Sequence, residues 1–225
     1  MHIGYPVFEA FVPGIGAGCR FNKNKAEHLL QFDAFYSPSL KSDDGLGNNH
    51  ILQENKSKFT FLKLSHRMYF PLITAGRFNL DFGGAACLDF QHRYLTYLSG
   101  LEERTSDINL CLGPDAKLKY NSAGTLSVNL AFSSMFYIPY LNTGKLKRWD
   151  EEGQLIYESN YHAFYYRTIF DISLGYSLKQ GPEISFGYAK DNVVGFANAR
   201  PLFYIDVMKH FRLDRMHEFY IRYHF

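Results

Sequence analysis

The sequence has few cysteines, little net charge and no long apolar run, and each shortage excludes a class of protein. Its 225 residues contain 3 Cys, 8 Pro and one Trp, and 24 basic side chains against 22 acidic ones leave a net charge of +2. No stretch approaches the roughly 18 uninterrupted apolar residues of a membrane-spanning helix. The near-neutral charge offers no strong electrostatic footprint for nucleic acid. Together with a 17% aromatic share, it also excludes a disordered chain.

Cysteine use gives no indication of a disulfide framework, a metal centre or another cofactor. Cys19, Cys87 and Cys111 lie far apart in sequence, form no C-x-x-C pair and have no histidine at metal-ligand spacing. We therefore expect three small residues placed within strands, with no metal and no cofactor. Because their number is odd, at least one thiol stays unpaired.

Residues 1–12 lack the basic region, the apolar stretch and the small-residue cleavage site of a secretory signal. Two explanations are open: a signal peptide has been removed, or the protein stays in the cytosol. The strand pattern described next favours removal.

Aromatic residues are abundant, because 21 Phe and 17 Tyr bring the aromatic share to 17%. Over residues 77–94, apolar side chains at even positions alternate with polar or small ones at odd positions. A period of two is that of a β-strand, and a helix would mix the two sets around its circumference. A strand of this length spans roughly 60 Å and far exceeds the usual strand. We expect it to cross a bilayer and to project beyond it.

The same alternation recurs along the chain. It is clearest at 126–140 and 164–178. Shorter versions occur at 15–21, 30–36, 62–72, 116–120, 184–188, 203–211 and 219–225. Several strands with one apolar face and one polar face predict an all-β protein.

The connections between these strands are of two kinds. Short segments that contain Gly or Pro predict tight hairpin turns at 73–76, 122–125 and 179–182. Long and mostly polar segments run over 38–56, 96–107, 144–161 and 192–201. Short and long connections alternate in outer-membrane barrels. We predict one domain over residues 1–225, an antiparallel up-and-down transmembrane β-barrel of 8–10 strands with ten as the best single count.

In these strands and in its last residues, the chain resembles the small outer-membrane β-barrel proteins of Gram-negative bacteria, the OmpA/OmpX-like class. The ending alternates Phe219, Ile221, Tyr223 and Phe225 with polar residues or Tyr, and it is similar to the C-terminal signal that the barrel-assembly machinery recognises. The resemblance implies a location in the bacterial outer membrane, contact with its lipid and assembly by that machinery. It implies no catalytic motif.

One feature conflicts with this class. If the short turns are periplasmic, counting strands forward from residues 77–94 places the C-terminal Phe on the outer side. Residues 203–211 could belong to an outer loop, a first strand could precede Met1, or the long connections could face the periplasm. We favour the first two together, because they give an even strand count.

A barrel of this size has an interior that side chains can fill. Charges of both signs fall in the inward phase of the strands, and an unpaired buried charge is costly. We expect them to pair in a plug that closes the lumen, with a narrow polar path for small solutes or ions as the alternative. The predicted lumen charges are Arg20, Asp33, Lys63, Arg67, Arg77, Asp81, Asp89, Arg93, Lys117, Arg167, Asp171 and Arg222.

The sequence contains no arrangement that predicts catalysis. No G-x-S-x-G elbow occurs, and no Ser/His pairing can be read from spacing. Asp206 and His210 share a strand face, which leaves an outer-membrane protease or a lipid A-modifying enzyme as a remote alternative. The glycines at 14–18 lack the Lys-Ser/Thr of a phosphate loop, so we expect them to permit curvature or close approach.

The long loops have two explanations, a charged segment that is simply solvated or a surface that contacts a partner. Arg148 and Trp149 lie in a charged segment that holds the only Trp, and exposed Trp and Arg often anchor protein contacts. We expect a structural or interaction role, with an envelope protein as partner through the loops and no nucleic acid. The alternatives are a narrow channel and a soluble lipocalin-like barrel whose apolar face points inward around a ligand.

Overall fold

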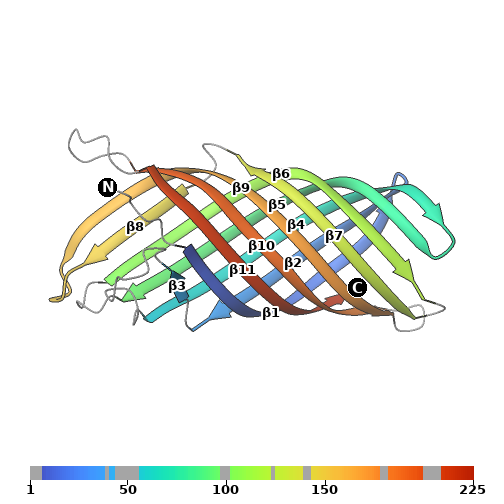
Figure 1. The fold of residues 1–225 in the computed structure, drawn as a ribbon, viewed down its shortest axis with the longest axis horizontal. Coiled ribbons are helices and arrows are strands. Elements are labelled where there is room, and N and C mark those ends of the chain that lie inside the picture. The colour runs from blue at the N-terminus through green and yellow to red at the C-terminus, as the bar shows by residue number, and fades with distance from the viewer. Residues whose placement is uncertain are drawn as a thin grey trace.

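The chain forms a closed all-β barrel of long, tilted strands (Figure 1). The computed structural model describes residues 7–38, 41–43, 56–96, 102–122, 125–138, 143–177, 182–199 and 209–225. Their strands are β1 (Val7–Lys23), β2 (Ala26–Ser37), β3 (Lys41–Asp43), β4 (Lys56–Ala75), β5 (Phe78–Thr96), β6 (Glu102–Asn121), β7 (Leu126–Tyr137), β8 (Thr143–Trp149), β9 (Leu155–Ser177), β10 (Glu183–Ala199) and β11 (Lys209–His224). In this part of the chain, no helix is long and apolar enough to cross a membrane.

Nine of the described strands make the barrel wall, in the order β1-β2-β4-β5-β6-β7-β9-β10-β11. Neighbours in this ring are antiparallel except β11 and β1, which close it as a parallel pair. The predicted count of ten and the wholly antiparallel topology are therefore wrong, although a closed barrel within the predicted range is confirmed. The two other described strands extend one end: β3 pairs with β1, and β8 lies between β6 and β9 beyond the end of β7.

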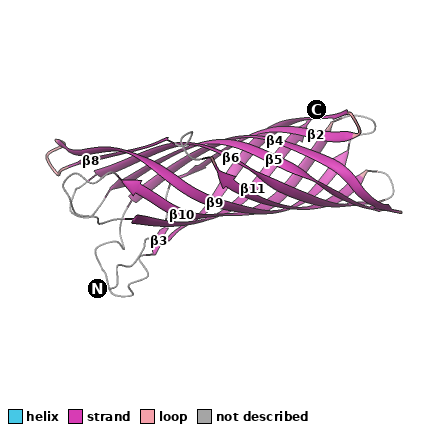
Figure 2. Ribbon diagram, turned by 90° about the horizontal axis from the view of Figure 1, so that it is seen from above, coloured by secondary structure: helices cyan, strands magenta, loops and turns pink. Residues whose placement is uncertain are grey.

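The parallel pair removes the conflict over the C-terminal Phe. Val7 is opposite Leu213 and Gly18 is opposite His224, so β1 and β11 run in the same direction. The start of β1 and the end of β11 consequently lie at opposite ends of the barrel (Figure 1; Figure 2 shows the barrel from above). Phe225 lies at the end with the short turns, beside Gly18 and Arg20, so the strand count no longer places it at the opposite end. Of the strand predicted over 203–211, residues 209–211 belong to β11, which runs unbroken from Lys209 through His224; residues 203–208 lie outside the described part of the chain.

Two of the connections at this end, β1–β2 and β4–β5, are two-residue turns. Asn24 and Lys25 both have positive φ, at 52° and 65°, as the type I′ hairpin requires. The hairpin predicted at 73–76 lies later in the chain, because β4 continues to Ala75 and the turn is formed by Gly76 and Arg77. Arg77 is therefore exposed in a turn. Its predicted place among the lumen charges is wrong.

The opposite end of the barrel contains more strand than predicted. Three of the expected long loops are largely strand, because β6 begins at Glu102, the β8–β9 hairpin occupies most of 143–177, and β10 continues to Ala199. A ladder needs only backbone groups, so polar side chains on both faces are compatible with a strand that extends into water. The expected loop at 38–56 lies mostly outside the described residues.

The two faces of the wall differ in chemistry. Outward side chains are large and apolar, such as Phe82 at 53% exposure and Phe132 at 50%, whereas the inward Asp89 is 1% exposed. The lumen also holds an apolar layer that the sequence pattern did not reveal. Phe35, Phe59 and Phe61 pack inside with Val12 and Met216, although we expected the aromatic residues mainly outside.

Candidate functional site: the charged lumen

Alternation along the strands directs ionisable side chains from almost every wall strand into the lumen. Ten of the twelve predicted lumen charges are buried, Arg20 keeps 28% of its side chain exposed, and Arg77 is the exception already described. The ten are Asp33, Lys63, Arg67, Asp81, Asp89, Arg93, Lys117, Arg167, Asp171 and Arg222.

Arg167 on β9 is the centre of the most buried cluster. Its Nη1 donates to Asp89 Oδ2 at 2.5 Å, and its Nε donates to both carboxylate oxygens of Asp191 at 2.9 and 3.0 Å. All three side chains are fully buried. Asn109 donates to the other oxygen of Asp89 at 3.1 Å. The guanidinium thus joins β5 to β10 through the interior.

Lys63 makes a second connection across the lumen. Its Nζ lies 3.0 Å from Glu218 Oε2, and both groups are buried. The ammonium also lies over the rings of Phe35 and Phe61, at 5.2 and 5.6 Å from their centroids. Cation–π contacts of this kind compensate part of the lost hydration, so the apolar layer and the ion pairs stabilise each other.

Arg222 on the closing strand β11 joins two further carboxylates. Its Nε donates to Asp33 Oδ1 at 2.9 Å, and its Nη1 donates to Asp171 Oδ2 at 3.2 Å. The Tyr220 ring lies 3.3 Å below the guanidinium, and its hydroxyl donates to Asp171 at 2.5 Å.

The glycines of β1 and β10 give this cluster its space. A Cβ on Gly16 would lie 2.2 Å from Asp33 Oδ1, and one on Gly187 would lie 2.2 Å from the Tyr220 ring. The glycines at 14–18 were predicted to permit close approach, and the groups that approach their backbone are side chains in the lumen.

A small cavity remains toward the short-turn end. Its volume is about 50 Å³, which is room for roughly three or four waters. Arg20 pairs with Glu183 at 3.0 Å, and Lys117 pairs with Glu27 at 2.9 Å along its lining. The cavity is lined by charges of both signs, so it suits water more than an ion of either sign.

Several members of the network were not predicted. Glu183 and Asp191 occupy odd positions of β10, whereas the outward side chains occupy even positions from Ile184 to Tyr188. The same alternation, extended beyond the predicted strand 184–188 at both ends, would have placed both carboxylates in the lumen. Glu218 and Asp115 each lie one residue before a predicted strand, at 219–225 and at 116–120 respectively. The predicted strand boundaries were too short, whereas the phase was correct.

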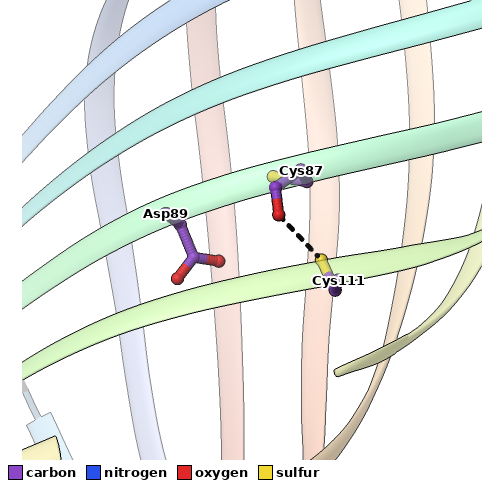
Figure 3. Close-up of side chains that lie close together, drawn as sticks. All are labelled: Cys87, Asp89 and Cys111. Atoms are coloured by element: carbon purple, nitrogen blue, oxygen red, sulfur yellow. Dashed lines mark hydrogen bonds between the residues drawn. The ribbon is translucent and has the colours of Figure 1, made fainter. Parts of the chain in front are cut away.

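Two cysteines that are distant in sequence meet beside Arg167. Cys87 on β5 and Cys111 on β6 are directly opposite in register, and both are buried. Their sulfurs and a carboxylate oxygen of Asp89 all lie within 4.8 Å of one another (Figure 3). The Cys111 thiol donates weakly to the Cys87 carbonyl at 3.5 Å, and its sulfur lies 3.8 Å from Met135 Sδ.

The predicted loop contact lies in the β8–β9 hairpin. Trp149 packs against Arg104, with 4.7 Å from the guanidinium to the ring centroid, and Arg148 lies over Tyr157. Lys145 and Lys147 both pair with Glu158 on the neighbouring strand. The hydrogen bond from Lys145 is the main cause that lowers the pKa of Glu158 below its usual value.

The four residues of the predicted assembly signal all face outward, with Phe225 the most exposed at 70%. Asp206 lies outside the described residues, as does the side chain of His210. No protein-family model, curated protein or solved structure matches this chain.

Proposed function

We propose that this chain is an outer-membrane β-barrel with a closed lumen and a structural or interaction role. The observation that carries the proposal is its inverted polarity: large apolar side chains cover the outside, while charged groups fill the inside. Soluble monomers rarely expose contiguous apolar surface beyond a few hundred Å². Alternating strands with an outward apolar band are what a bilayer-spanning barrel needs.

The outward tyrosines support the same proposal. Tyr166 and Tyr223 are 37% and 38% exposed, and both combine an apolar ring with a hydroxyl that favours water. Such residues are enriched at the boundary between lipid and water. A soluble ligand-binding barrel is less well supported, because Phe78 and Phe82 point outward and the lumen holds ion pairs in place of an apolar pocket.

The ion pairs favour a closed barrel over a channel. Arg167 and Lys63 join strands that are not neighbours in the wall, so their contacts cross the lumen. Buried pairs of this kind are strongly destabilised by loss of one partner, and a solute passing through would have to separate them. Among the described residues, the observation that supports the narrow-channel alternative is the small cavity near the short turns.

The interaction role is assigned to the β8–β9 hairpin. It extends the wall beyond β7 and carries Arg148 and Trp149 together with the exposed Leu155 and Ile156. Aromatic and Arg side chains are enriched in protein contacts, and exposed aliphatic side chains add apolar area that a partner can bury. We propose a protein of the cell envelope as the partner.

Two measurements test the proposal. The purified chain is expected to require detergent and to change its gel mobility on heating; a monomer that stays soluble without detergent would refute the membrane assignment. In planar bilayers, the wild-type chain is expected to give no conductance steps. Regular steps in its presence would replace the closed barrel with the channel.

A further inference from the structure

We propose that Cys87, Cys111 and Asp89 form a binding site for a thiophilic divalent metal cation inside the lumen. The three residues come from the adjacent strands β5 and β6 and lie close together (Figure 3). This site is independent of where the barrel resides and of what its loops contact.

The spacing of the donor atoms suits one ion. A metal–thiolate bond is about 2.3 Å long, so two sulfurs on the same ion lie roughly 3.8–4.6 Å apart. The two sulfurs and the Asp89 oxygen are all within 4.8 Å of one another, which leaves only small adjustments of the side chains. Met135 adds a thioether 3.8 Å from the Cys111 sulfur, and soft ligands of this kind favour thiophilic metals.

Charge selects a divalent cation. On binding, Cys87 and Cys111 each lose a proton to solvent and two sulfur–metal bonds form, with no change of oxidation state. Two positive charges leave as protons and two arrive as metal, so the net charge of the buried cluster stays constant. A monovalent cation would instead leave one uncompensated negative charge in the interior, which is costly.

The surroundings already hold the ligands in place. Asn109 and Arg167 each donate to Asp89, at 3.1 and 2.5 Å, and Arg167 Nη1 lies 3.5 Å from the Cys87 sulfur. Hydrogen bonds to a ligating carboxylate orient it and are themselves part of metal sites. The carboxylate oxygens retain lone pairs, so Asp89 can coordinate while it keeps both donors.

The test uses the full chain in detergent, reduced with a phosphine and titrated with Cd²⁺. We expect one ion per barrel, an ultraviolet cadmium–thiolate absorption, release of two protons per ion and displacement by Zn²⁺. C87S and C111S are expected to abolish the absorption, and Asn109→Ala to weaken binding by about 10-fold. The matched control is C19S, since Cys19 is exposed on the outside and is expected to leave all readouts unchanged.

A second measurement does not depend on the folding of the cysteine variants. In C19S protein, Cd²⁺ is expected to protect the two remaining thiols from alkylation. No absorption with excess Cd²⁺, or binding that is lost in C19S, would overturn the proposal. Two missing thiols before reduction, with no Cd²⁺ binding after it, would overturn it in favour of a cross-strand disulfide.

Discussion

Arg167 on β9 and Asp89 on β5 meet inside the barrel with 2.5 Å between Nη1 and Oδ2, although β6 and β7 separate their strands in the wall. Both side chains are fully buried. The same guanidinium holds Asp191 on β10, so one cation neutralises two carboxylates from different sides of the lumen. Strands that share no hydrogen bonds are thereby fixed relative to one another.

Replacing Arg167 is expected to destabilise the barrel strongly. Arg167→Met keeps much of the side-chain volume but leaves Asp89 and Asp191 without their cation, which is expected to cost about 3–5 kcal/mol. The measurement is urea unfolding in detergent micelles, followed by gel mobility. Lys145→Met is the matched control, because it removes an exposed ion pair with Glu158 and is expected to cost at most about 1 kcal/mol.

The triple variant Arg167→Met, Asp89→Asn and Asp191→Asn distinguishes charge from packing. It removes both orphaned charges, so we expect it to recover most of the stability lost in Arg167→Met. Equal stability of Arg167→Met and Lys145→Met would contradict the central role of this cluster.

A Cβ at Gly16 is expected to disrupt the Arg222 cluster. In Gly16→Ala the methyl group would lie 2.2 Å from Asp33 Oδ1 and 3.0 Å from the Phe32 carbonyl, so Asp33 must move away from Arg222. Overpacking of this kind costs about 1–3 kcal/mol. Gly84→Ala is the control, since its nearest contact is an ordinary 3.6 Å, and it is expected to stay within about 1 kcal/mol of wild type. If Gly16→Ala unfolded at the same urea concentration as the wild type, the added methyl group would not displace Asp33 and the prediction would be wrong.

The period-two pattern was sufficient to predict the barrel, because the alternation of side chains is a property of each strand by itself. It also placed Asp33, Lys63 and Arg222 correctly inside. It could not predict which charges pair, since the pairs join strands that are distant in sequence: Arg222 and Asp33 are separated by 189 residues.

The strand count failed for a different reason. Periodicity locates strands but does not state how the first and last strands meet, so the parallel β1–β11 pair had no local signature. Cys87 and Cys111 show the same limit. Their pairing follows from the β5–β6 register, which the alternation within each strand does not specify.

A lysine on the outer face is expected to destabilise the barrel only where lipid covers it. Phe132 on β7 and Ile156 at the start of β9 are about equally exposed, at 50% and 54%. In lipid vesicles, Phe132→Lys is expected to cost about 2–4 kcal/mol near the bilayer midplane. Ile156→Lys lies in the projecting hairpin and is expected to have little effect. Urea unfolding from vesicles measures both. If Phe132→Lys were as stable as Ile156→Lys, the apolar band would not be facing lipid.

The ring of Phe225 is expected to matter for assembly in the cell more than for the stability of the finished barrel. Its backbone closes the seam, with its N–H donating to Gly18 O at 3.0 Å and its carbonyl accepting from Arg20 N at 3.3 Å. Phe225→Ala keeps both bonds, so the purified, refolded variant is expected to unfold at nearly the wild-type urea concentration.

In cells that export the chain with a signal peptide, the same Phe225→Ala variant is expected to reach the outer membrane at a several-fold lower level. Phe186→Ala is the control, because Phe186 is also an outward aromatic, at 54% exposure, but lies away from the C-terminus. Heat-modifiable migration in isolated membranes measures the assembled fraction. β11 runs toward the short-turn end, which faces the periplasm in the proposed orientation, so Phe225 is then on the side of a periplasmic assembly factor. Equal assembly of the two variants would remove the C-terminal signal from the proposal while leaving the barrel itself intact.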